Sequence, residues 1–145
     1  MKNKWPLAGM VAMAFLLSAC DNHKSYRAFL TDKMETVFES QDISQYDSIV
    51  IMPRVGCTSC IHKSESFLKK YIDNNKVLFV FTRIGNEKKL KIEIGNDILS
   101  RKNVVIDRNN AFVKSTYEES SYPILMERMP DGTFDYRLLP GVRKY

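Results

Sequence analysis

Hydrophobic and polar positions change their period several times along the chain, and each change predicts a new element of secondary structure. Between residues 26 and 40 the apolar side chains recur at spacings of three and four, which predicts an amphipathic helix. Two uninterrupted apolar runs, "DSIVIMP" at 47–53 and "NKVLFVFT" at 75–82, predict buried strands. The first run ends at Pro53, which has no N–H to donate to a neighbouring strand.

Helical spacing returns after each of these two strands. Apolar positions from Ile61 to Ile72 predict a helix after the first strand. The segment 86–100 is ambiguous, because its apolar residues fit both one face of a helix and the alternation of a strand. We favour a helix capped by Asn86, because strands are predicted on both sides of it.

The last third of the chain predicts three more elements and a fold class. "NVVID" at 103–107 is typical of a buried strand, and the segment 108–120 predicts a short helix. Two apolar strands within 122–141 are joined by "PDG" at 130–132, a strong turn signal that predicts a hairpin. Because strands and helices alternate before this hairpin, we expect an α/β domain with a mostly parallel sheet and one antiparallel pair.

The N-terminus has the layout of a secretory signal peptide. A basic start with Lys2 and Lys4 is followed by an apolar run at 11–17, which is too short for a comfortable transmembrane span. The run ends in "LSAC", which resembles the bacterial lipobox, so that Cys20 would be lipidated and become the new N-terminus. An ordinary signal peptide with a chance cysteine is the alternative.

These motifs divide the chain into a signal peptide at 1–19, a lipidated N-terminus and polar tether at 20–27, and one domain at 28–145. Loss of the signal peptide removes two lysines and no acid, and lowers the formal charge from +5 to +3. This charge is small and dispersed, and it gives no indication of nucleic-acid binding. A location outside the cytoplasmic membrane allows a cysteine pair to be oxidised.

Two of the three cysteines, Cys57 and Cys60, stand where the first strand gives way to a helix. A thiol that exchanges disulfides works as the thiolate, which the N–H groups and dipole of a helix N-terminus stabilise. Cys57 is therefore the candidate nucleophile and Cys60, one turn later, the more buried resolving thiol. His62 and Lys63 add positive charge nearby.

Two other interpretations of the pair stay open. A purely structural disulfide would gain little, because it closes a very short loop. A metal site could draw on Cys57, Cys60 and His62, but a tetrahedral site needs three or four ligands and the only other histidine is His23, on the tether. We therefore expect no metal, and we expect His62 to be an exposed helix residue.

The motifs "GCTSC", after the strand "SIVIM", and Tyr122-Pro123, before "ILMERM", resemble the thioredoxin-like superfamily over about residues 45–141. The resemblance implies a three-layer α/β/α sandwich with a mixed, mostly parallel sheet. It also implies that Pro123 is a cis proline facing the cysteines, and that the backbone at Tyr122 pairs with the substrate. An extra helix–strand unit before Pro123 looks like the branch that contains peroxiredoxins and membrane-tethered reductases of cytochrome maturation.

Three features depart from that family. Gly56 stands where most thioredoxins have a tryptophan, and the strand before it has no acidic residue to lie beneath the cysteines. Little chain follows Gly141, so the usual C-terminal helix is missing. We expect the helix at 26–40 to cover that side of the sheet instead. No peroxidatic threonine pattern precedes Cys57, which argues against a peroxidase.

The resemblance implies a membrane-anchored thiol–disulfide oxidoreductase of the bacterial envelope that needs no dissociable cofactor. Its partners would be proteins with disulfides and an upstream protein reductant, and we expect a monomer. The direction could be reversed, with the protein acting as an oxidant. The alternative is a binding module: a thioredoxin-like fold that only holds partners, or a copper chaperone.

Overall fold

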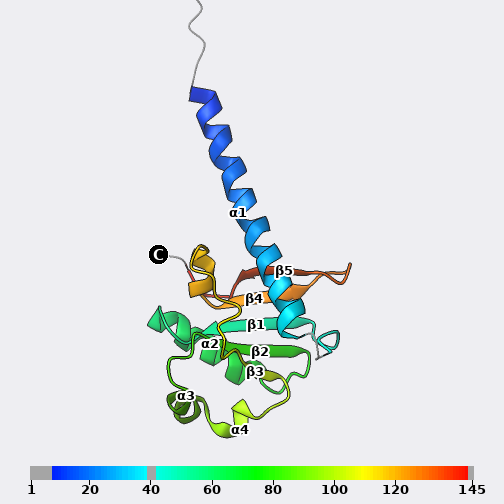
Figure 1. Ribbon diagram of the computed structural model, residues 1–145, viewed down its shortest axis with the longest axis vertical. Coiled ribbons are helices and arrows are strands. Elements are labelled where there is room, and N and C mark those ends of the chain that lie inside the picture. The colour runs from blue at the N-terminus through cyan, green and yellow to red at the C-terminus, as the bar shows by residue number, and fades with distance from the viewer. Residues whose placement is uncertain (1–7, 39–41, 144–145) are drawn as a thin grey trace, which may run out of the picture.

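The computed structural model describes the backbone of residues 8–38 and 42–143 and the side chains of residues 23–38 and 42–143. Five strands form one mixed sheet in the order β3-β2-β1-β4-β5 (Figure 1). They are β1 (Ser48–Pro53), β2 (Val77–Thr82), β3 (Val104–Ile106), β4 (Ile124–Arg128) and β5 (Phe134–Leu138). The α/β class expected from the alternating pattern is confirmed.

Strand direction divides the sheet into two parts. β1, β2 and β3 pair in parallel, whereas β4 is antiparallel to both of its neighbours, β1 and β5. The expectation of one antiparallel pair is wrong, because the hairpin joins the sheet beside β1 through β4, which adds a second antiparallel pairing. β1 and β2 are buried almost throughout, as their continuous apolar sequences predict. β3 is an edge strand with β2 as its partner, and only Val104 of its three residues is fully buried.

One face of the sheet is covered by the long helix α1 (Ala8–Val37). Its buried residues recur every four positions at Tyr26, Leu30, Met34 and, just past the helix, Phe38. They pack on alternate side chains of the sheet: Ile49, Ile51, Leu78, Val80, Ile124 and Met126. The prediction that this N-terminal helix covers a face of the sheet is confirmed. The expectation of a tether at 20–27 is wrong, because this segment is part of the same helix.

The opposite face is covered by α2 (Thr58–Tyr71) and α3 (Glu87–Ile94). Cys60 and Leu68 of α2 and Leu90 of α3 pack there on Val50, Met52, Phe79, Phe81 and Leu125. The predicted cap of α3 is confirmed, because the Asn86 side chain accepts a hydrogen bond from the Lys89 N–H. Gly95, at φ 95°, separates α3 from a short further helix, α4 (Asn96–Leu99).

The prediction of a short helix over 108–120 is wrong for most of that segment. Only a 3-10 turn, η1 (Glu118–Ser121), forms there. The buried carboxylate of Asp107 accepts hydrogen bonds from the backbone N–H groups of Ala111 and Phe112. Asn110 also takes a positive φ of 53°. A side chain that captures these N–H groups competes with the backbone bonds of a helix. Phe112 is buried with the residues of α1 rather than on a helical face of its own.

The C-terminal hairpin forms as predicted. β4 and β5 pair antiparallel from Ile124↔Leu138 to Arg128↔Phe134. The turn contains Gly132 at φ 83°, a conformation that glycine adopts without the strain other residues meet. Asp131 accepts hydrogen bonds from the N–H and hydroxyl of Thr133, which closes the turn locally.

Candidate active site

The two cysteines lie at the start of α2, as the sequence predicts. Cys57 is the N-cap residue, with φ −61° and ψ 111°, and its carbonyl accepts hydrogen bonds from the N–H groups of Cys60 and Ile61. Cys57 is partly exposed, whereas Cys60 is 3% exposed and belongs to the core under α2. This difference assigns the accessible sulfur to Cys57 and the shielded one to Cys60.

Cys57 and Cys60 are joined by a disulfide, with their Cα atoms 5.2 Å apart. The Cys57 sulfur also accepts a hydrogen bond from the Cys60 backbone N–H, at 3.3 Å. This N–H, which also donates to the Cys57 carbonyl, belongs to the first turn of α2, where N–H groups lack the carbonyl partner four residues earlier. A negative charge that develops on Cys57 when the disulfide opens would therefore be stabilised by the helix N-terminus.

Ser59 is a second polar contact of the same sulfur, and sequence reasoning missed it. Its hydroxyl oxygen lies 3.1 Å from Cys57 Sγ. A sulfur in a disulfide carries no hydrogen, so the Ser59 hydroxyl is the donor. The only signal in the sequence was the presence of two hydroxyl residues, Thr58 and Ser59, between the two cysteines.

The loop before Cys57 lies against the segment that precedes β4. A Cβ atom placed on Gly56 would lie 3.5 Å from the carbonyl oxygen of Ser121. Gly56 also has a φ of 124°, in the region that other residues rarely adopt. The backbone conformation of this loop therefore explains why a glycine stands directly before Cys57.

Tyr122 and Pro123 follow Ser121 directly. The fold therefore brings the two residues that were expected to bind the substrate close to the cysteine loop. Pro123 is buried, and its carbonyl accepts a hydrogen bond from the Leu139 N–H at 2.9 Å. Tyr122 is half-buried and packs, together with Cys57, against the core that contains Cys60.

The expectation that Pro123 is cis is wrong, because no peptide bond among the described residues is cis. Tyr122 has φ −114° and ψ 153°, the extended conformation that a residue before proline prefers. The extended chain thus enters β4 with the trans bond, the more stable form of an X–Pro bond by about 0.5–1 kcal/mol.

No protein-family model, characterised protein or solved structure matches this chain.

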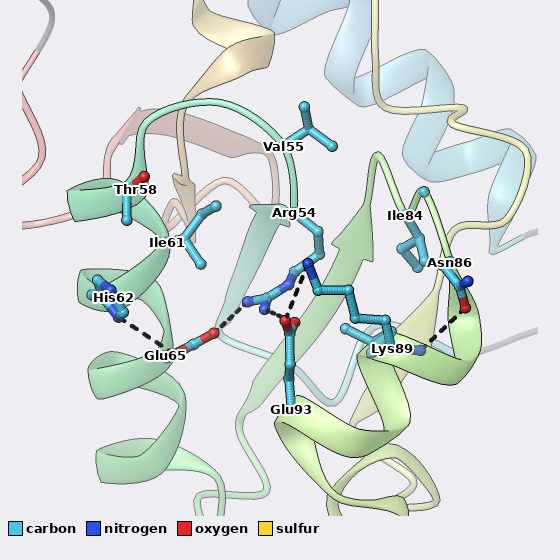
Figure 2. Close-up of a pocket in the computed structure, with 12 residues that line it drawn as sticks. Arg54, Val55, Thr58, Ile61, His62, Glu65, Ile84, Asn86, Lys89 and Glu93 are labelled. Carbon is cyan, nitrogen blue, oxygen red and sulfur yellow. Dashed lines mark hydrogen bonds and ion pairs between the residues drawn. The ribbon is translucent and has the colours of Figure 1, made fainter.

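A groove of about 560 Å³ opens beside the cysteines, between α2 and α3 (Figure 2). Thr58, the residue after Cys57, lines it, together with Val55 from the preceding loop, which is 48% exposed. The guanidinium of Arg54 donates to Glu65 of α2 and to Glu93 of α3, each at 2.7 Å. Arg54 therefore ties the two helices together at the floor of the groove.

The two basic residues after Cys60 contact groups other than the disulfide. The His62 side chain is 72% exposed on the groove side of α2, with Nδ1 3.9 Å from Glu65 Oε2. The Lys63 ammonium donates to the carbonyl of Gly141 in the C-terminal segment. The expectation that His62 is an exposed helix residue is confirmed.

Two further predicted features concern metal and lipid. Within the described residues, no three His, Cys, Asp or Glu side chains are grouped so that they could hold a metal ion. Cys20 lies within α1, but its side chain is outside the described residues, and so is the start of the predicted signal peptide. Over the part of the chain that is described, no helix has an apolar stretch long enough to span a bilayer.

Proposed function

We propose that this chain is a lipid-anchored, thioredoxin-like thiol–disulfide oxidoreductase of the bacterial cell envelope. The observation that carries the proposal is the Cys57–Cys60 disulfide at the start of α2, with the sulfur of Cys57 in contact with two donors, the Ser59 hydroxyl and the Cys60 N–H. A thiolate at a helix N-terminus is the reactive form in disulfide exchange.

Several features of the fold support the thioredoxin-like part of the proposal. The cysteines follow β1, Pro123 stands directly before β4, and the sheet ends in the antiparallel pair β4–β5. An additional unit of α3, α4 and β3 is inserted between the cysteines and Pro123, and β3 joins the sheet edge beside β2. This order of elements is the one that the resemblance implies.

The reaction begins with the reduced protein. The Cys57 thiolate attacks one sulfur of a partner's disulfide, the partner's S–S bond breaks, and the released partner thiolate takes up a proton. Cys60, losing its proton, then attacks the mixed disulfide and releases the second partner thiolate. The partner gains two electrons and two protons, and the Cys57–Cys60 pair is left as a disulfide.

Each turnover therefore leaves the protein oxidised, so a second dithiol must return two electrons to the pair. We propose that an upstream protein dithiol of the envelope does this by the same exchange. With an upstream oxidant in its place, the same residues would insert disulfides into partners. The lipid on Cys20 would hold the protein at a membrane, where more than one acyl chain gives stable anchoring.

The test is the reduction potential of the Cys57–Cys60 pair. The detergent-solubilised chain is equilibrated with glutathione or dithiothreitol buffers, and alkylation is measured by mass spectrometry, with Cys57→Ser as the control. A potential between about −120 and −270 mV supports disulfide exchange and indicates its direction. A potential below about −300 mV is typical of a structural disulfide, and the catalytic proposal would then give way to a binding role.

A further inference from the structure

α1 is fastened to the sheet almost immediately after Cys20. The ring of His23 stacks on Tyr136 of β5, with centroids 4.4 Å apart and planes 13° apart. Nε2 of His23 also lies 3.9 Å from a carboxylate oxygen of Asp135. Because a helix rises 1.5 Å per residue, only about 5 Å of helix separates Cys20 from this first contact.

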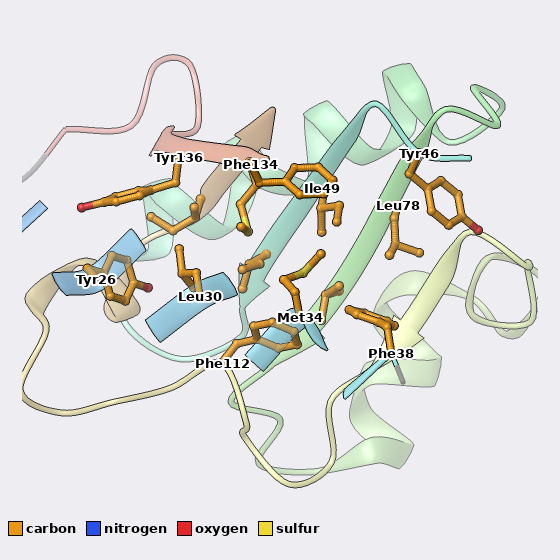
Figure 3. Packing of buried hydrophobic residues seen from close by; sticks show 14 residues of the cluster. Tyr26, Leu30, Met34, Phe38, Tyr46, Ile49, Leu78, Phe112, Phe134 and Tyr136 are labelled. Carbon is orange, nitrogen blue, oxygen red and sulfur yellow. The ribbon is translucent and has the colours of Figure 1, made fainter. Parts of the chain in front are cut away.

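The next helical residues strengthen the attachment (Figure 3). Tyr26 is 1% exposed and meets Tyr136 edge to face, with centroids 5.0 Å apart. Arg27 donates from Nε to the carbonyl of Phe134, at 2.9 Å, and from a second guanidinium nitrogen to the Thr133 hydroxyl, at 3.1 Å. The turn of α1 at 23–27 is thus held by stacked rings, charge-assisted hydrogen bonds and a buried side chain.

The same turn of α1 contacts the segment that leads to the cysteines. The rings of Tyr26 and Phe29 lie 5.0 and 5.8 Å from the ring of Tyr117. The Tyr117 carbonyl accepts hydrogen bonds from the N–H and hydroxyl of Ser120. These bonds lie at the beginning of the 3-10 turn η1. The next residue, Ser121, is the one whose carbonyl lies against Gly56. A continuous series of contacts therefore connects the anchored helix with the cysteine loop.

We propose that α1 holds the cysteine pair at a fixed, short height above the membrane, and that the partner disulfides belong to membrane-embedded proteins and lie close to the bilayer. This inference rests on the proposed function, both for lipidation of Cys20 and for exchange at Cys57. A domain of this size is roughly 35 Å across, so the pair stays within about that distance of the lipid. Figure 1 shows α1 extending beyond the domain at one end, with α3 and α4 at the other. Residues 8–19 of this helix belong to the predicted signal peptide, so the anchored helix would begin at Cys20.

The height of the cysteine pair above the membrane can be measured without an assay of disulfide exchange. The lipidated Cys60→Ser chain carries a donor dye on Cys57 in phosphatidylcholine vesicles whose headgroups carry the acceptor. We expect a single narrow distribution of energy transfer. A flexible segment of about 20 Gly and Ser residues inserted between Asn22 and His23 has a mean end-to-end distance of about 25 Å. We expect it to broaden the distribution and to lower the mean transfer by at least about twofold.

A second variant loosens the attachment of α1 to the C-terminal hairpin without lengthening the chain. His23→Ala combined with Arg27→Ala removes the contacts to β5 that are partly exposed, and circular dichroism checks that the fold remains. We expect this variant to broaden the transfer distribution. Lys24→Ala, an exposed residue on the same turn, should leave it narrow. A distribution that is already broad in the native sequence overturns the inference.

The partner class is tested with two transmembrane peptides that carry the same disulfide on polyproline spacers. Spacers of 3 and 20 residues place it about 9 and 60 Å above the lipid. We expect the reduced, vesicle-bound chain to reduce the near disulfide at least about tenfold faster than the far one. The chain with the flexible insertion should reduce both within about twofold of each other, because its longer tether lets the domain reach both heights.

A soluble peptide with the same disulfide separates the possible failures. If the detergent-solubilised chain does not reduce it, the proposed function fails and this inference fails with it. If the chain reduces the soluble peptide but shows no preference between the two spacers, only the inference about membrane-proximal partners is overturned. If the chain does not stay with the vesicles, anchoring at Cys20 is wrong.

Discussion

At the scale of single residues, the contacts that matter most for the proposed chemistry converge on one sulfur atom. Cys57 Sγ accepts from the Cys60 N–H and from the Ser59 hydroxyl, and both donors stabilise it more strongly as a thiolate than as part of a disulfide. Stabilisation of the thiolate favours the reduced protein, so it makes the pair a stronger oxidant. Ser59 should therefore contribute to the reduction potential.

We expect Ser59→Ala to make the potential of the pair more negative. Loss of a hydrogen bond worth about 1 kcal/mol at this partly exposed sulfur corresponds to a change of roughly 20 mV. Alkylation of Cys57 in the reduced protein at neutral pH should also become slower. Thr58→Ala is the matched control, because Thr58 also lies between the cysteines but faces the groove. Equal effects of the two substitutions would contradict a specific role for the Ser59 hydroxyl.

At the scale of elements, Arg54 connects α2 and α3 beside the cysteine loop. Its side chain is 9% exposed and donates to Glu65 and Glu93. The hydrogen bond from Arg54 is the main reason why the pKa of Glu93 lies below its ordinary value of 4.5. A carboxyl group whose pKa is lower in the folded state stabilises the fold above its unfolded pKa, and this contribution is lost as the pH falls.

We expect Arg54→Met to lower the unfolding temperature at pH 7, because two carboxylates lose their shared partner. As the pH falls below 4.5, the carboxyl of Glu93 is protonated first where Arg54 does not hold it, and in the folded wild type only as the pH falls through its lowered pKa, where the Arg54 contribution is lost. The difference in unfolding temperature between wild type and variant should therefore shrink, as measured by circular dichroism at pH 7 and pH 3.5. Arg101→Met removes an ion pair with Asp73 whose side chains are 41% and 85% exposed, and should change little. A constant difference at both pH values would exclude the ionic explanation.

At the scale of the whole molecule, two cores on opposite faces of the sheet hold the fold together, and the disulfide packs with the core under α2 and α3. Only Cys60 of the pair is fully buried. The bridge closes a loop between residues three apart in sequence. By the loop-closure relation, such a short loop restricts the unfolded chain by no more than about 2 kcal/mol.

We therefore expect the protein to stay folded when the pair is reduced. The far-ultraviolet circular dichroism should be unchanged by dithiothreitol, and the unfolding temperature should fall by no more than roughly 10 °C. Cys60→Ala provides a permanently unbridged comparison. Unfolding on reduction would instead identify the bridge as a structural staple and weaken the proposed exchange activity.

Much of the fold could be predicted from the sequence because local patterns report local structure. The apolar runs of β1 and β2, the cap at Asn86 and the turn at Gly132 each carry their own signal. The segment 108–120 could not be predicted in this way. There, Asp107 captures backbone N–H groups that a helix would have used, and Phe112 is buried under a helix from the other end of the chain.

The sequence by itself determined the class of the domain, the position of Cys57 and Cys60 at a helix start and the candidate chemistry of the pair. These follow from periodicity, capping and the nature of a thiol, which depend on neighbouring residues. Only the tertiary structure decided that Ser121 lies against Gly56, that Arg54 joins α2 to α3, and that α1 is clamped to β5 right after Cys20. Such contacts join residues far apart in the chain, and the order of strands in the sheet brings them together.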